Sequence, residues 1–114
     1  MTQPGVRDEA VLDVVSLIPA GALASYGDIA EVVGALGVPC TPRQAARTLS
    51  RFGSGVPWWR VVQAAGTVAE EVLPEARTRL VAEGIVVVGR RVPLGQMRWT
   101  PDVEALRAEL DFGG

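Results

Sequence analysis

A chain of 114 residues with a formal net charge of −2 is long enough for one folded domain, residues 1–114, with a modest core. It has a single cysteine and no histidine, so we expect no internal disulfide, no zinc or other metal site and no cofactor. Membrane-spanning runs and signal-peptide features are absent from the sequence, and we expect a cytoplasmic monomer with no membrane partner.

The first half of the chain predicts three short helices separated by turns rich in Gly and Pro. Ser25 is suited to cap the second helix, and Thr41-Pro42 to supply the cap and the first residue of the third. The helices are expected over residues 8–18, 26–33 and 42–52.

The second half predicts a small hairpin, two more helices and one short strand. The hairpin would pair residues 59–63 with residues 67–69 around the turn at Ala65-Gly66. Gly84 is placed to end the first of the two helices. These helices are expected over residues 74–83 and 101–110, and a buried strand over residues 85–88. Two helices joined by a tight turn and followed by a hairpin are typical of a mostly α winged helix-turn-helix.

The third predicted helix carries arginines at every fourth position, which places them along one face. No acid lies between Glu31 and Glu70, so this face is suited to a polyanion, and its small neighbouring residues would let the helix approach a groove floor. A core role for Ala45, Ala46 and Leu49 is the alternative, but it does not explain the arginines. We expect double-stranded DNA to contact Thr41, Arg43, Gln44, Ala45, Ala46, Arg47 and Arg51.

Ordered motifs across most of the chain resemble the O6-alkylguanine-DNA alkyltransferase family. They are I-P-A-G-A-L-A-S-Y-G-D-I-A (residues 18–30), P-R-Q-A-A-R (42–47), V-P-W-W-R-V-V (56–62), A-E-G-I (82–85) and R-W-T-P (98–101). P-W-W-R stands where the family's active-site signature reads P-C-H-R, so Trp58 and Trp59 replace the acceptor cysteine and the activating histidine. The chain is most similar to the alkyltransferase-like proteins, in which Trp replaces that cysteine.

The resemblance implies a winged helix-turn-helix of the alkyltransferase DNA-binding type and a function without catalysis. Such a protein binds O6-alkylguanine in DNA and passes the lesion to nucleotide excision repair proteins. Arg47 matches the finger that enters through the minor groove and replaces an extruded nucleotide, and Tyr26 matches the tyrosine that helps to rotate that nucleotide out. A core aromatic is the structural alternative for Tyr26. The implied lesion pocket consists of Tyr26, Pro57, Trp58, Trp59 and Arg60.

Two departures from the family pattern bear on lesion binding. Alkyltransferase-like proteins usually retain the histidine, and the bulkier Trp59 is expected to reshape or partly fill the pocket. Glu70 and Glu71 stand where those proteins often have a basic residue, and carboxylates near phosphate weaken binding. A second interpretation is therefore a winged-helix DNA-binding or regulatory module with a pocket filled by Trp. Arg60 has two possible roles: it supports the motif structurally, or it contacts DNA.

Cys40 suggests a third interpretation, an active alkyltransferase. Its surroundings, P-C-T-P-R, are similar to the signature, but they precede the third predicted helix whereas the family's acceptor follows it. Without a histidine to activate it, a neutral thiol is a poor nucleophile. We expect Cys40 to be a small, buried turn residue.

Overall fold

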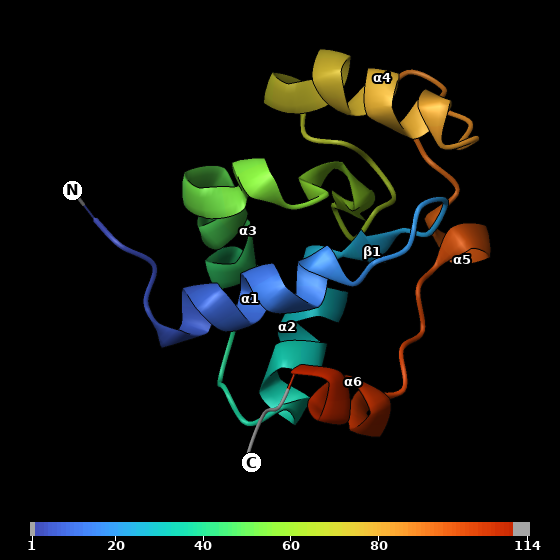
Figure 1. Ribbon diagram of the computed structural model, residues 1–114. Coiled ribbons are helices and arrows are strands. Elements are labelled where there is room, and N and C mark those ends of the chain that lie inside the picture. The colour runs from blue at the N-terminus through green and yellow to red at the C-terminus, as the bar shows by residue number, and fades with distance from the viewer. Residues whose placement is uncertain (1, 111–114) are drawn as a thin grey trace.

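The computed structural model describes residues 2–110, and three helices at its N-terminal end pack around one apolar core (Figure 1). They are α1 (Val6–Ser16), α2 (Tyr26–Ala35) and α3 (Pro42–Phe52). The apolar spacing that predicts the first helix also buries it, because Val11, Val14 and Val15 have no exposed surface. All three predicted helices are confirmed, although α1 begins and ends two residues earlier than expected.

Reciprocal capping fixes where α2 and α3 begin. The Asp28 N–H donates to Ser25 Oγ at 2.9 Å, and the Ser25 N–H donates to Asp28 Oδ2 at 3.0 Å. Thr41 and Gln44 form the same arrangement at α3, with distances of 3.0 and 3.1 Å. These capping boxes satisfy backbone donors that a helix otherwise leaves free, so both predicted caps are confirmed.

A two-stranded parallel sheet joins the helices to the second half of the chain. β1 (Ala24–Ser25) pairs with β2 (Val61–Val62), with Ala24 opposite Val61 and Ser25 opposite Val62. All four residues are buried, as parallel pairs in proteins usually are. The mostly helical class with one small sheet is confirmed.

The predicted hairpin is wrong in its pairing. The Gln63 N–H donates to the Thr67 carbonyl at 2.9 Å and closes a turn, but the chain then leaves this partner. The Val68 N–H donates to the Arg90 carbonyl at 2.8 Å, and Thr67 bridges Arg91. Burial is the physical reason: the apolar pair of β2 finds a buried partner in β1, and Ala64 and Ala65 in the turn after it are exposed.

A second core lies under α4 (Leu73–Ala82), which crosses the molecule away from the three helices (Figure 1). The predicted helix is confirmed, and Gly84 follows it with a φ of +84°. The buried strand expected over residues 85–88 is wrong, because Val86 and Val88 are 67% and 69% exposed and Val88 only bridges Arg91. The second core consists of Leu23, Val62, Val68, Ala76, Leu80, Ile85, Val87, Val92 and Leu94.

The C-terminal part returns to the first core, in which Leu106 is buried. The short helix α5 (Leu94–Met97) was not predicted, and α6 (Val103–Leu110) begins two residues after the predicted start. Between them, the Leu23 N–H donates to the Met97 carbonyl at 2.8 Å, and the Trp99 N–H donates to the Leu23 carbonyl at 2.7 Å. Three 3-10 turns complete the described chain: Gly53–Gly55, Trp58–Arg60 and Glu70–Val72. Within residues 2–110, no helix has both the length and the apolar character needed to cross a membrane.

Candidate nucleic-acid interface

The solvent-facing side of α3 is basic. Arg43, Arg47 and Arg51 are all exposed, and within residues 2–110 none of the three forms a salt bridge. The side chains of Thr41 and Gln44 each accept a hydrogen bond from the backbone of the other residue. They therefore fix the start of α3, the helix that carries Arg43. A helix face with free guanidinium groups is suited to phosphates, as the sequence predicts.

Two residues of α3 face the core instead. Ala45 is fully buried against α1 and α2, so the prediction that it contacts DNA is wrong and its alternative, a core role, holds. Thr48 is 1% exposed, and its hydroxyl donates to Asp8 Oδ1 at 2.5 Å. The small residues of α3 therefore serve two sides: Ala45 lets the helix pack closely on the core, and Ala46 faces outward.

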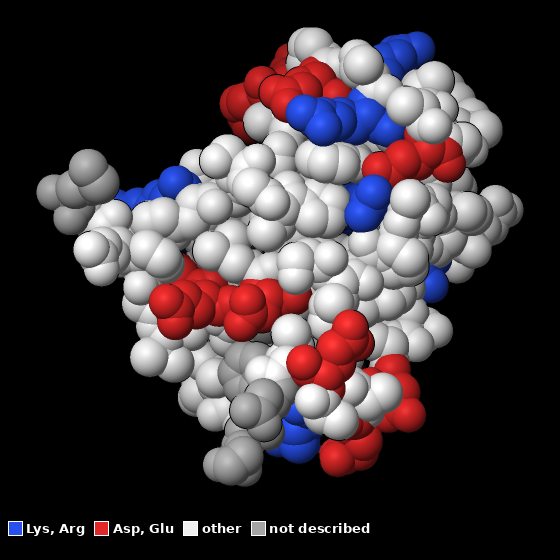
Figure 2. Space-filling view, viewed as in Figure 1, with Lys and Arg blue, Asp and Glu red and all other residues white. Residues whose placement is uncertain are grey.

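Acidic side chains gather elsewhere on the surface. In the view of Figure 2, red patches cover α1 and α6, which carry Glu9 and Glu104, and both signs mix over α4. On α4, Arg79 pairs with Glu75 at 3.5 Å. The weakly acidic net charge is thus compatible with a basic α3, because the acids are concentrated on other elements.

A cavity of about 560 Å³ lies beside α3. This volume falls within the range of about 300–1,000 Å³ that is typical of small-molecule sites. Its walls come from α2, from the middle and end of α3, from the P-W-W-R turn and from the turn at Glu70–Val72. The lining residues are Tyr26, Ala46, Leu49, Ser50, Ser54, Trp58, Gln63, Ala69, Glu71 and Val72.

Each of the two cores contributes an aromatic residue to the wall of this cavity. Tyr26, the first residue of α2, packs against the first core, and Trp58 packs against the second. Burial raises the pKa of the Tyr26 hydroxyl, and the negative charge of Glu71 raises it further. The hydroxyl therefore stays protonated and can donate a hydrogen bond to a ligand. Both residues line the cavity, and their role in a lesion pocket stays a prediction.

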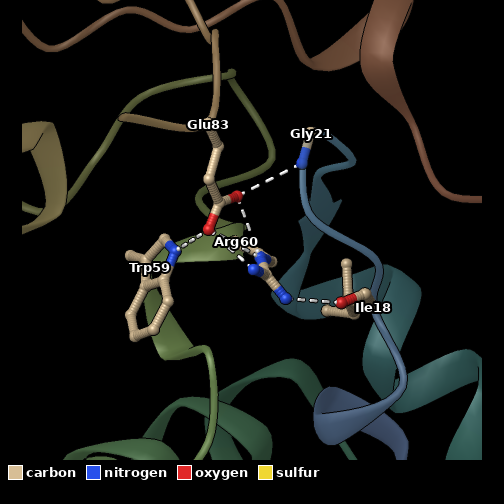
Figure 3. Close-up of polar contacts among 5 residues, drawn as sticks. All are labelled: Ile18, Gly21, Trp59, Arg60 and Glu83. Atoms are coloured by element: carbon tan, nitrogen blue, oxygen red, sulfur yellow. Dashed lines mark hydrogen bonds and ion pairs between the residues drawn. The ribbon is translucent and has the colours of Figure 1, made fainter. Parts of the chain in front are cut away.

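Trp59 does not fill the cavity. Its indole Nε1–H donates to Glu83 Oε2 at 2.8 Å (Figure 3), and Trp59 is not among the residues that line the cavity. The Arg79 guanidinium lies 4.5 Å from the ring centroid, in cation–π contact, and Trp58 meets the ring edge to face at 5.8 Å. The interpretation of a pocket filled by Trp is wrong, because a carboxylate and a cation hold this side chain elsewhere.

Arg60 ties the P-W-W-R turn to both halves of the molecule. Its Nη2 donates to Glu83 Oε2 at 2.6 Å, and its Nη1 donates to the Ile18 carbonyl at 2.7 Å (Figure 3). Glu83 also accepts the Gly21 N–H at 3.2 Å. Arg60 is thus a buttress, and neither Arg60 nor Pro57 lines the cavity, which corrects their predicted place in the pocket.

Glu83 is charged at the centre of this network. Burial opposes its ionisation, but hydrogen bonds from Arg60, Trp59 and the Gly21 backbone outweigh burial and lower the pKa of its carboxyl. The side chains of Arg60 and Glu83 are only 15% and 13% exposed, so water does little to screen their attraction. The sequence contained Glu83 within A-E-G-I, but no spacing rule indicated its partners.

Sequence reasoning missed most of the cavity wall. Leu49 and Ser50 come from the last part of α3, Ser54 comes from the 3-10 turn that follows it, and Gln63, Ala69 and Val72 come from the turns after β2. Only the path of the chain after β2 brings these segments opposite α3, so periodicity could not find them. Glu71 was singled out by its charge, and it lines the cavity whereas Glu70 does not.

Cys40 lies outside the cavity, immediately before the other end of α3. The thiol is half-buried against the first core, and burial raises its pKa despite the nearby Arg7. A raised pKa leaves less thiolate, so this position is unsuited to nucleophilic attack. Among the described residues, no group of three or more His, Cys, Asp or Glu side chains is placed to hold a metal ion.

Comparison with known proteins places this arrangement in a family. The family model described as the DNA-binding domain of 6-O-methylguanine DNA methyltransferase matches residues 7–85. The DNA base-flipping protein of Escherichia coli K12 is 36% identical over 96 residues, which cover 80% of this chain and 72% of that protein. Alkyltransferase-like protein 1 of Schizosaccharomyces pombe is 31% identical over 83 residues, or 68% of this chain and 74% of that protein.

A solved structure extends the similarity to the fold. It is a crystal structure of the S. pombe alkyltransferase-like protein in complex with damaged DNA containing O6-carboxymethylguanine. The two folds superpose with a TM-score of 0.74 at 27% identity, over 89% of this chain and all of that one. The chain therefore belongs to the family of the 6-O-methylguanine DNA methyltransferase DNA-binding domain.

Proposed function

We propose that the protein binds double-stranded DNA through α3 and holds an O6-alkylated guanine, turned out of the duplex, in the cavity between Tyr26 and Trp58. The observation that carries the proposal is that this cavity is open, at about 560 Å³, while Glu83 holds Trp59 outside it. The names of the relatives support it, because one is a base-flipping protein and another was crystallised on damaged DNA.

The arrangement of α3 suits nucleotide flipping. Ala46 lines the cavity and its neighbour Arg47 points to solvent, so a duplex lying on the basic face would meet Arg47 beside the entrance. Flipping costs a few kcal/mol of stacking and pairing. A planar guanidinium can stack on bases and donate hydrogen bonds together, so Arg47 would occupy the gap that the nucleotide leaves.

Tyr26 is placed to act on the same nucleotide. It begins α2, and its ring lines the cavity. We propose that its ring crowds the backbone of the target nucleotide while its hydroxyl donates to a phosphate or to the base.

The protein would retain the lesion without reacting with it. The indole of Trp58 can pack on a flipped base, but it is not a nucleophile for alkyl transfer. Cys40 lies outside the cavity and its thiol is disfavoured as thiolate. Transfer to nucleotide excision repair proteins stays a prediction of the family resemblance.

Competitive gel shifts test the proposal with two duplexes that differ only in one O6-methylguanine. We expect the modified duplex to compete roughly tenfold better. A 2-aminopurine placed at the target position should brighten on binding, because the base leaves the stack. Equal affinity for the two duplexes would contradict lesion recognition. Mass spectrometry of the protein after incubation should show no added alkyl group.

A further inference from the structure

Glu71 gives the cavity a negative charge. It is the one formally charged residue among the ten that line the cavity, and the other polar ones are Tyr26, Ser50, Ser54 and Gln63. Two nearby arginines are occupied elsewhere: Arg60 is bonded to Glu83, and Arg79 lies over the Trp59 ring. A ligand in the cavity therefore meets a carboxylate with no cation in the lining to balance it.

The effect of that carboxylate reaches the far wall. The charge of Glu71 contributes to the raised pKa of the Tyr26 hydroxyl, which belongs to a different element. Charges that interact across a partly enclosed site are screened less than charges on an open surface. A substituent on a base held in the cavity would experience the same field.

The alkyl substituents of O6-alkylguanine differ in charge. A methyl group is neutral, a carboxymethyl group is anionic at neutral pH, and a carbamoylmethyl group has the shape of carboxymethyl but is neutral and carries N–H donors. The S. pombe relative was crystallised with the anionic one. A cavity with an unbalanced carboxylate repels that anion and accepts hydrogen bonds from an amide or a hydroxyl.

We propose that Glu71 makes this cavity selective for neutral and hydrogen-bond-donating O6 substituents over anionic ones. The inference rests on the proposed function, since it assigns a ligand class to the same cavity. Its physical content is specificity by repulsion: the carboxylate adds little to the binding of a methyl adduct but penalises a second carboxylate in the same space.

The test uses four duplexes of one sequence, with guanine, O6-methylguanine, O6-carbamoylmethylguanine or O6-carboxymethylguanine at one position. We expect the wild-type protein to bind the carbamoylmethyl duplex about fivefold more tightly than the carboxymethyl duplex, a ratio of the size that one partly screened charge pair produces. Glu71→Gln should bring that ratio to within about twofold of unity, because the amide is isosteric and uncharged.

Glu70→Gln is the matched control. Glu70 is adjacent in sequence and exposed, as Glu71 is, but it lies outside the cavity lining, and its removal changes the net charge of the protein by the same unit. Both variants should strengthen binding to all four duplexes through phosphate attraction, but Glu70→Gln should keep the fivefold ratio. A ratio that changes equally in both variants would overturn the proposal.

The two proposals fail in different ways. If all three adducts bind more tightly than guanine but the carboxymethyl duplex binds as well as its amide isostere, charge selectivity is overturned and lesion binding stands. If no adduct binds more tightly than guanine, the proposed function itself fails. Circular dichroism of each variant shows whether a loss of binding reflects unfolding, and retention of the wild-type spectrum is expected.

Discussion

Trp59 donates its indole N–H to the Glu83 carboxylate at 2.8 Å and is absent from the lining of the cavity beside Trp58. Two adjacent tryptophans leave the same turn in different directions: one lines the cavity, and the other is held under Arg79. The residue that the sequence suggests as a plug for the pocket is thus part of the polar network around Glu83 and not of the cavity wall.

Trp59→Phe isolates that bond. The phenyl ring keeps most of the packing and the contact with Arg79, but Glu83 loses one donor, so we expect the free energy of unfolding to fall by about 1 kcal/mol. Lesion affinity should stay within about twofold of wild type, because the ring lies outside the cavity. Urea unfolding and gel-shift titration measure the two quantities. A large gain in lesion affinity would mean that Trp59 obstructs the site after all.

The lowered pKa of Glu83 predicts that the stability of the protein depends on pH. Its pKa is lowered on folding from an ordinary value of 4.5, so its stabilising contribution is fully present above that value and is lost as the pH falls through the lower folded value. Glu83→Gln should cost on the order of 3 kcal/mol at pH 7 and progressively less in acid. Thermal melts of both proteins between neutral and acidic pH test this, and the difference between the melting temperatures should shrink toward low pH. Asp8, whose pKa is also lowered, affects both proteins alike.

Arg47→Ala tests the role of α3 in flipping. We expect the affinity for the modified duplex to fall roughly tenfold and that for the unmodified duplex to fall less. Arg47 enters the DNA duplex only when the nucleotide is flipped out. Arg77→Ala removes the same charge from α4 and should leave the preference for the lesion unchanged. Titration over a range of salt concentrations separates the general phosphate term from the specific one. An equal loss on both duplexes for Arg47→Ala would indicate a plain phosphate contact.

Two glycines offer a matched comparison of backbone conformation. Gly66 has a φ of +79°, and a Cβ there would meet the Val92 carbonyl oxygen at 3.3 Å. Gly66→Ala should therefore destabilise the protein by about 1–2 kcal/mol. Gly34 lies in α2, and a Cβ added there would meet no neighbouring element within 4 Å, so Gly34→Ala should stabilise by about 0.5–1 kcal/mol. Opposite signs in chemical denaturation are the expected result.

Local patterns predicted the helices because their causes are local. The spacing of Val11, Val14 and Val15 and the caps at Ser25 and Thr41 act within a few residues, and each lies where expected. The pairing of β2 with β1 and the position of Glu83 under Trp59 depend on residues more than twenty positions apart. Spacing rules contain no term for such contacts, so the hairpin and the filled pocket were both wrong.

The same distinction applies to the cavity. Family motifs located Tyr26 and Trp58, which line it, but also suggested Pro57, Trp59 and Arg60, which do not. Sequence adjacency to Trp58 was misleading because a 3-10 turn sends successive side chains in different directions.

The cavity walls belong to two separate cores, one packed against Tyr26 and the other against Trp58. The width of the site therefore depends on how the two cores are placed relative to each other, and not on any one element. The bonds of Arg60 with Glu83 and Ile18 and the two-residue sheet connect the two halves of the molecule and so fix this width. A substitution deep in either core could change which bases fit without altering a single residue that touches them.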